Sequence, residues 1–71
     1  MNFGEALNAL KEGAKVARNN WNGKDMWVAL EYPDETSKMK RPFLYMAPID
    51  GEFVPWVASQ TDLLAEDWHT V

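Results

Sequence analysis

Residues 54–68 mark a change from strand to helix near the end of the chain: Val-Pro-Trp-Val-Ala-Ser-Gln-Thr-Asp-Leu-Leu-Ala-Glu-Asp-Trp. Pro55 has no backbone N–H for a sheet ladder, so we expect the preceding strand, Phe53 and Val54, to end there. Ser59 followed three residues later by Asp62 is a box-like capping pattern, which predicts a short helix over 60–65. Free N–H groups at a helix start suit phosphate or carboxylate, and Trp56 offers a ring beside them. Capped helices that bind nothing show the same local pattern.

A first helix is predicted at the other end of the chain. Asn2 and Glu5 form an N-cap pattern, and apolar residues recur at positions 3, 6, 7 and 10, one face of a helix. Gly13 is a typical helix end.

Between the helices, apolar and polar residues alternate in short segments. Strands are predicted over 15–18, 26–32 and 42–46, with a final strand over 68–71. Residues 33–41 are polar and predict a mobile loop, and Asp50-Gly51 is a hairpin signal. The order predicts an α+β fold: one domain over 1–71, with a small, mostly antiparallel sheet of four to five strands, an N-terminal helix and a short C-terminal helix.

The composition indicates an oligomer. A chain of 71 residues builds a small core, and with no Cys and one His it lacks disulfides and the common zinc sites. Four Trp, three Phe and two Tyr are many for such a core, so some are expected at an interface or a ligand pocket. We therefore expect a homo-oligomer and no metal.

Charge argues against a nucleic-acid polymer as partner. The net charge is −4, whereas a DNA or RNA backbone requires a basic face. All seven basic residues lie within 1–41, and residues 42–71 carry only acidic charge. This polarity would let one subunit's first half face another's second half, although solubility alone also explains a net charge. With no signal peptide and no membrane-length apolar run, we expect a cytoplasmic protein and no membrane partner.

Residues 18–24 carry the most suggestive local chemistry. Trp21 offers a stacking ring, Asn22 an amide, and Arg18 and Lys24 two cations for phosphates. Asn22-Gly23 is also a favourable turn sequence, and the Trp21 ring could instead fill a small hydrophobic core. The residues alone leave the binding and the packing interpretations open.

Catalytic patterns are missing from the sequence. Glu66, Asp67 and His69 would not share one face, so we interpret them as solvated surface. No nucleophilic triad, phosphate loop or other catalytic motif is present, which disfavours an enzyme.

Three segments resemble the phage anti-Thoeris proteins of the second type, a family of small signal sponges: the opening Met-Asn-Phe-Gly-Glu-Ala-Leu, residues 18–24 and residues 54–68. The resemblance covers nearly the whole chain and is weakest across 33–41. It implies a compact homotetramer, in the cytoplasm of an infected bacterium, that captures a cyclic ADP-ribose isomer made by an immune TIR-domain enzyme. It implies binding without cleavage and without a cofactor, which would block Thoeris immunity, or CBASS-type immunity if cyclic oligonucleotides are held too.

The resemblance assigns ligand contacts at matching positions. Trp21 is the stacking ring, and the polar contacts are Ser59, Gln60, Thr61 and Asp62, with Asp62 accepting from an adenine amino group or a ribose hydroxyl. The full set of candidate ligand-binding residues is Arg18, Trp21, Asn22, Gly23, Lys24, Ser59, Gln60, Thr61 and Asp62. The chain departs from the family at two places: Asn20 stands where the family tends to have Gly, and Ala47 to Gly51 replace a Lys-Thr-Ala-Asp-Gly stretch. The second departure removes a Lys and a Thr that could donate to phosphate, which weakens the assignment of the ligand more than that of the fold. The alternative function is a phage accessory module that binds and inhibits a host protein.

Overall fold

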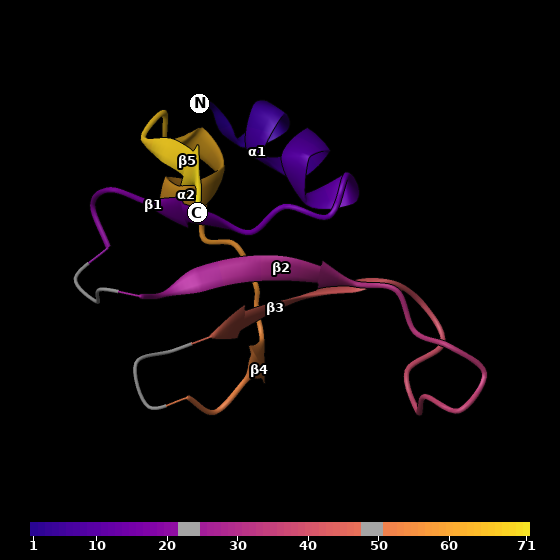
Figure 1. The fold of residues 1–71 in the computed structure, drawn as a ribbon. Coiled ribbons are helices and arrows are strands. Elements are labelled where there is room, and N and C mark those ends of the chain that lie inside the picture. Colours follow the sequence, from indigo (N-terminus) through magenta and orange to yellow (C-terminus); the bar gives the residue numbers. More distant parts are fainter. Residues whose placement is uncertain (22–24, 48–50) are drawn as a thin grey trace.

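A computed structural model of the chain describes residues 1–21, 25–47 and 51–71. Two helices and five strands follow one another as α1 (Phe3–Lys11), β1 (Val16–Arg18), β2 (Trp27–Glu31), β3 (Phe43–Ala47), β4 (Val54–Pro55), α2 (Gln60–Leu64) and β5 (Trp68–Thr70). The strands form one antiparallel sheet in the order β4-β3-β2-β1-β5 (Figure 1). The predicted α+β class, with a helix near each end of the chain, is confirmed.

Helix α1 begins and ends where its local sequence indicates. The Asn2 side chain accepts from the Glu5 amide at 2.8 Å, and the Glu5 carboxylate accepts from the Asn2 amide at 3.0 Å. This reciprocal box satisfies amides that have no acceptor inside the helix. The chain leaves the helix through Gly13, whose φ of +97° lies in the left-handed region that glycine adopts without strain.

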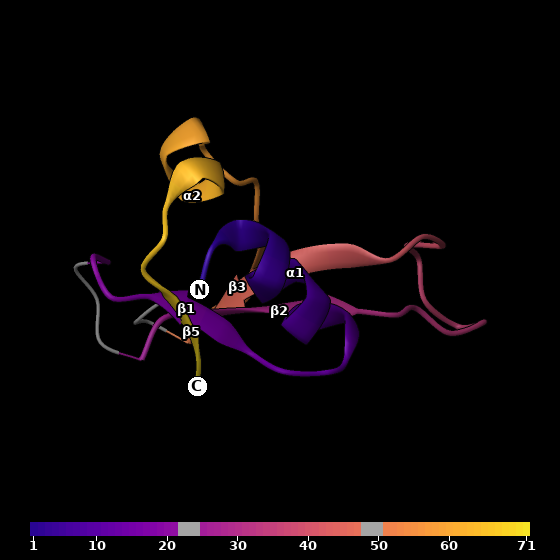
Figure 2. The same ribbon diagram turned by 90° about the horizontal axis from the view of Figure 1, so that it is seen from above.

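The sheet separates its residues onto two faces. In the register of β2 with β3, Val28 pairs with Met46 and Ala29 pairs with Tyr45. Because successive side chains of a strand point to opposite faces, Val28 and Met46 lie on one face and Ala29 and Tyr45 on the other. We call the first the helix face, since α1 packs over it (Figure 2), and the second the open face.

The core lies between α1 and the helix face. Its fully buried cluster consists of Ala6, Leu10, Val16, Val28 and Trp68. Phe3 packs against this cluster, with its ring centroid 5.4 Å from that of Trp68. Phe3 is therefore a packing residue, as the sequence indicates. Neither helix in the described ranges has the length and apolar character that a membrane crossing requires.

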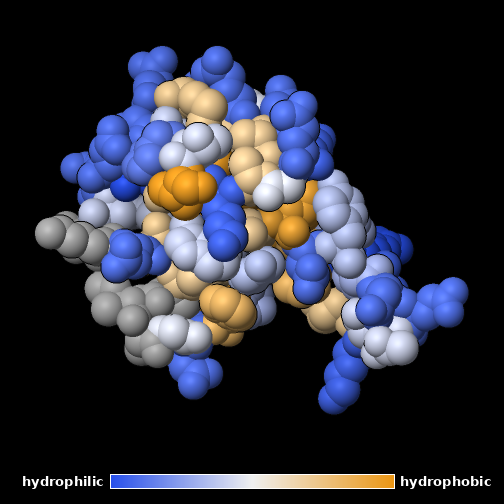
Figure 3. Space-filling view, viewed as in Figure 1, coloured by the Kyte–Doolittle hydropathy of each residue, from blue (hydrophilic) through white to orange (hydrophobic). Residues whose placement is uncertain are grey.

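Residues 32–42 join β2 to β3 as a loop that projects beyond the sheet (Figure 1). In the space-filling view this projection, at the lower right, is mostly hydrophilic, while hydrophobic residues gather over the middle of the molecule (Figure 3). Asp34 organises part of the loop by accepting from the Thr36 amide at 2.9 Å and from the Ser37 hydroxyl at 2.9 Å.

Strand β4 differs from its predicted bounds. The strand was predicted over Phe53 and Val54, whereas β4 consists of Val54 and Pro55. Pro55 is thus the last residue of the strand, as expected, but it also takes part in it by pairing with Tyr45. The reason is that β4 is an edge strand, where one side of the backbone needs no ladder partner and proline is tolerated. Gly51 has the positive φ of a turn glycine, +82°. Its predicted hairpin partner Asp50 lies outside the described residues.

The core predicts a clear stability difference between two leucines. Leu10→Ala removes a side chain that is 1% exposed, so we expect the free energy of unfolding to fall by about 2–5 kcal/mol. Leu64→Ala, on a side chain that is 81% exposed, should change it by no more than about 0.5 kcal/mol. Urea unfolding followed by tryptophan fluorescence measures both, and equal effects would contradict this assignment of the core.

Candidate ligand-binding site

Arg18 joins three segments that are far apart in the sequence. Its Nη1 donates to Asp62 Oδ1 at 2.9 Å, and its Nε donates to Asp67 Oδ1 at 2.8 Å. Strand β1 is thereby tied to α2 and to the segment that leads into β5. The guanidinium side chain is only 10% exposed, so both charge-assisted hydrogen bonds are shielded from water.

Asp62 organises the start of α2. Its Oδ2 accepts from the Ser59 amide at 3.1 Å, and its own amide donates to the Ser59 hydroxyl at 3.0 Å, which completes the predicted capping box. Trp68 Nε1 donates to the Asp62 carbonyl at 2.9 Å. The short helix therefore begins at a place fixed by Arg18, Ser59 and Trp68.

Trp21 lies beside this helix start as part of a cluster of tryptophans. Its ring meets those of Trp68 and Trp56 edge to face, at centroid separations of 5.4 and 6.4 Å. Its Nε1 approaches Asp62 Oδ1 at 3.5 Å, the outer limit of a hydrogen bond. The ring is half-buried against the core, which agrees with the interpretation of Trp21 as a packing residue. Its role in stacking on a ligand remains a prediction.

Trp56 lies between β4 and α2 and packs on the rings of Trp21 and Trp68. Its ring also packs on Phe3 of α1, at a centroid separation of 6.2 Å. The aromatic cluster thus links the strand-to-helix junction to the N-terminal helix.

The acidic pair keeps its charge because of these hydrogen bonds. Burial acts to raise the pKa of Asp62, but hydrogen bonds from Ser59 and Arg18 outweigh burial and hold that pKa below its ordinary value of 3.8. The hydrogen bond from Arg18 is the main cause that lowers the pKa of Asp67. The same two carboxylates raise the pKa of Arg18, led by Asp67. All three groups are therefore charged at neutral pH.

The structure brings some predicted site residues together. Arg18, Trp21 and Ser59 each contact Asp62, as described above. Gln60 and Thr61 follow Ser59 on the first turn of α2 and are exposed to solvent. The remaining candidates, Asn22, Gly23 and Lys24, lie outside the described residues.

The geometry bears on two expected sources of positive charge for an anionic ligand, the start of α2 and the side chain of Arg18. Helix α2 has only five residues, so few peptide dipoles align at its start and it attracts an anion less than a long helix would. Nε and Nη1 of Arg18, which was expected to be a phosphate ligand, donate to two carboxylates of its own chain, and its contact with a phosphate remains a prediction.

Asp67 is the residue that sequence reasoning missed. It was interpreted as solvated surface with Glu66 and His69, yet it is the second acceptor of Arg18 and also accepts from the Asn20 amide at 2.9 Å. The residues around Asp67 in the sequence do not reveal these hydrogen bonds, because the partners of Asp67 lie 49 and 47 residues upstream. In the described part of the chain, no group of three potential ligands is placed to hold a metal ion.

Comparison with known proteins identifies the family. A family model described as a Thoeris anti-defense 2-like domain matches residues 1–71. The chain belongs to the Thoeris anti-defense 2-like family. A curated relative named Thoeris anti-defense 2, from Bacillus phage SP01, is 38% identical over 84 residues, covering 100% of this chain and 94% of that protein. The resemblance drawn from the three sequence segments is thus confirmed at the level of the family.

The Asp62 contacts in this Thoeris anti-defense 2-like protein predict a pH-dependent stability. A carboxylate whose pKa is lowered by folding stabilises the fold above its ordinary pKa of 3.8 and loses that effect as the pH falls through the lowered value. Asp62→Asn should therefore reduce the free energy of unfolding by about 1–3 kcal/mol at pH 7, through the loss of hydrogen bonds to a charged group.

The difference between wild type and Asp62→Asn should stay constant from about pH 7 to 5 and shrink below 3.8, as measured by thermal unfolding across pH. Glu66→Gln, which changes an exposed carboxylate nearby, serves as the control. A difference that grows on acidification would contradict the assigned role of Asp62.

Proposed function

We propose that this chain is a phage anti-defence sponge, which binds and sequesters a cyclic ADP-ribose-type immune signal without cleaving it and so blocks Thoeris immunity. The observation that carries the proposal is the family match over residues 1–71, together with a curated Thoeris anti-defense 2 relative aligned over all of this chain. The proposal extends to cyclic oligonucleotides of CBASS-type systems as a second class of signal.

The contacts around Trp21 support a nucleotide site at the start of α2. Trp21 places an aromatic ring next to the first turn of the helix, and the side chains of Gln60 and Thr61 are exposed on that turn. Aromatic rings bind bases by stacking, and exposed amide and hydroxyl groups bond to ribose and base edges. We assign direct contacts to Trp21, Gln60 and Thr61.

Asp62 and Arg18 take a different role in this proposal. Asp62 already accepts from Arg18, Ser59 and Trp21, and its side chain is only 12% exposed. We therefore assign Asp62, Arg18 and Ser59 to positioning the helix start rather than to holding the ligand. Asn22, Gly23 and Lys24 remain proposed contacts, with Lys24 as the cation for phosphate because Nε and Nη1 of Arg18 already donate to carboxylates.

A protein with a net charge of −4 must also supply positive groups that balance the negative charge of the ligand's pyrophosphate. We propose that the protein acts as a cytoplasmic homo-oligomer, a tetramer, in which basic residues of one subunit complement the pocket of another. The supporting observation is the distribution of charge, since every basic residue lies within 1–41.

Sequestration is tested by recovery of the ligand. The protein is incubated with a cyclic ADP-ribose isomer, separated by filtration, and heat-denatured, and both fractions are assayed by mass spectrometry. We expect depletion of the free signal and its intact release on denaturation. Release of a cleaved product would show an enzyme, and no depletion would favour the alternative, a module that binds a host protein.

The assignment of direct contacts predicts unequal effects for two threonines. Thr61→Ala should weaken binding about tenfold, equivalent to about 1.4 kcal/mol, because one hydrogen bond to the ligand is lost. Thr70→Ala, at an exposed position on β5, is the matched control and should leave affinity unchanged. Calorimetric titration measures both. Equal affinities for wild type and Thr61→Ala would remove Thr61 from the site.

A further inference from the structure

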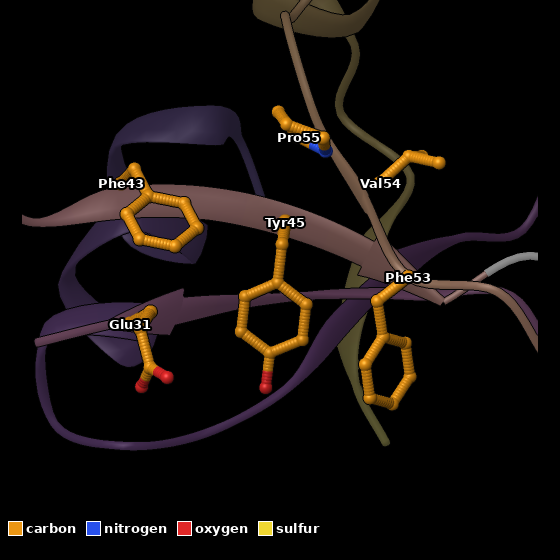
Figure 4. Close-up of a pocket in the computed structure, with 6 residues that line it drawn as sticks. All are labelled: Glu31, Phe43, Tyr45, Phe53, Val54 and Pro55. Carbon is orange, nitrogen blue, oxygen red and sulfur yellow. The ribbon is translucent and has the colours of Figure 1, made fainter. Parts of the chain in front are cut away.

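The open face of the sheet carries a group of aromatic rings that α1 does not cover. Tyr45 lies in the middle, with its ring centroid 5.4 Å from that of Phe53 and 6.5 Å from that of Phe43. None of these three rings belongs to the core cluster or packs against it. Their side chains project to the same side of the strands, together with that of Glu31 (Figure 4). We call these four residues the open-face cluster.

The register of the sheet places a carboxylate beside these rings. Glu31 pairs directly with Phe43 across β2 and β3, and Tyr45 pairs with Pro55 across β3 and β4. A shallow cavity of about 250 Å³ lies here, lined by Glu31, Phe43, Tyr45, Phe53, Val54 and Pro55. Cavities that hold drug-sized ligands measure about 300–1,000 Å³, so this one fits a smaller group.

The rings of the open-face cluster are tilted with respect to one another and do not stack. The planes of Phe43 and Tyr45 meet at 56°, and those of Tyr45 and Phe53 at 57°. Tilted rings leave part of each face open to a third group, and Phe53 is 63% exposed. A cation interacts with a ring when it lies within about 6 Å of the ring centroid. Because neighbouring centroids are 5.4 and 6.5 Å apart, a cation seated between two rings meets this condition for both.

The charge beside the cavity also favours a cation. Glu31 is exposed, and within residues 1–21, 25–47 and 51–71 it forms no ion pair. A carboxylate in this position repels phosphate and attracts positive charge. The same face already holds one cation on a ring, since Lys15 Nζ lies 4.4 Å from the centroid of the Trp27 ring. Lys15 does not line the cavity, so it leaves the Glu31 carboxylate available to a ligand.

The walls of the cavity also select among cations. A primary ammonium group carries three N–H donors. Of the side chains that line the cavity, Glu31 and Tyr45 offer oxygen acceptors and the other four are hydrocarbon. A primary ammonium ion that enters would lose hydrogen bonds to water without regaining all of them from these side chains, whereas a quaternary ammonium ion has no N–H to satisfy.

We propose that the open-face cluster binds a small quaternary ammonium ion, with Phe43, Tyr45 and Phe53 in contact with its methyl groups and Glu31 balancing its charge. This site shares no residue with the nucleotide site proposed at the start of α2, and it takes a ligand of the opposite charge. The inference is therefore independent of the proposed function.

Titration with choline, followed by proton NMR, tests the site. A trimethylammonium group seated between rings lies in their ring currents, so its methyl resonance should move upfield and reach saturation as protein is added. The neutral isostere 3,3-dimethyl-1-butanol has carbon in place of nitrogen and should bind about fivefold more weakly or less. Ethanolamine keeps the charge but carries N–H donors, and it should also bind more weakly than choline.

Two substitutions with matched controls test the assigned residues. Glu31→Gln keeps the shape of the side chain and removes its charge, so choline affinity should fall about two- to fivefold, whereas Glu35→Gln in the 32–42 loop should leave it unchanged. Phe53→Leu keeps an apolar side chain without a ring and should weaken binding about two- to fivefold, while Phe53→Tyr should retain it. All three positions are exposed, so we expect each variant to fold, which circular dichroism checks.

The absence of a saturable shift with the wild type would overturn the proposal. Equal affinities for choline and its neutral isostere would do the same, as would an affinity that neither Glu31→Gln nor Phe53→Leu changes. A peptide carrying trimethyl-lysine that binds more than about tenfold more tightly than choline would overturn the assignment to a free ion and make a protein side chain the occupant.

Discussion

The guanidinium of Arg18 is the contact on which the site depends. It reaches Asp62 at 2.9 Å and Asp67 at 2.8 Å, and so fixes a five-residue helix that is too short to be stable alone. Because the start of α2 is held there, the Ser59 capping box forms beside Trp21 and the exposed side chains of Gln60 and Thr61 occupy defined positions. Loss of either carboxylate leaves the shielded Arg18 cation with one acceptor fewer. This should lower the free energy of unfolding by more than the loss of an ion pair on the surface would.

The two faces of the sheet divide the aromatic residues between two tasks. On the helix face, Phe3, Trp21 and Trp56 pack edge to face around Trp68 and complete a core that the aliphatic residues alone would leave small. On the open face, Trp27 packs on Tyr45 and on Lys15, and Tyr45 also packs on Phe43 and Phe53. One set of aromatic rings therefore completes the core, and the other lies on the face that α1 does not cover.

Local signals in the sequence predict the local structure well. The Asn2 and Ser59 boxes each depend on residues three positions apart, and both are present. The alternation in 26–32 likewise predicts β2, whose observed bounds are slightly shorter. By contrast, the bonds of Arg18 span 44 and 49 residues, so no local pattern predicts that Asp62 and Asp67 are its acceptors. Similarly, the inclusion of Pro55 in β4 follows from its place at the sheet edge, which depends on the complete topology.

The central claim is that the ligand binds where Trp21 meets the first turn of α2. A titration of the ¹⁵N-labelled protein with a cyclic ADP-ribose isomer, followed by proton–nitrogen correlation spectra, tests it residue by residue. We predict saturable shifts of the Trp21 indole N–H and of the Gln60 and Thr61 amides, with little change at the Trp27 indole on the open face. Shifts that centre on Trp27 and Tyr45 and leave Trp21 and Thr61 unmoved would contradict the account.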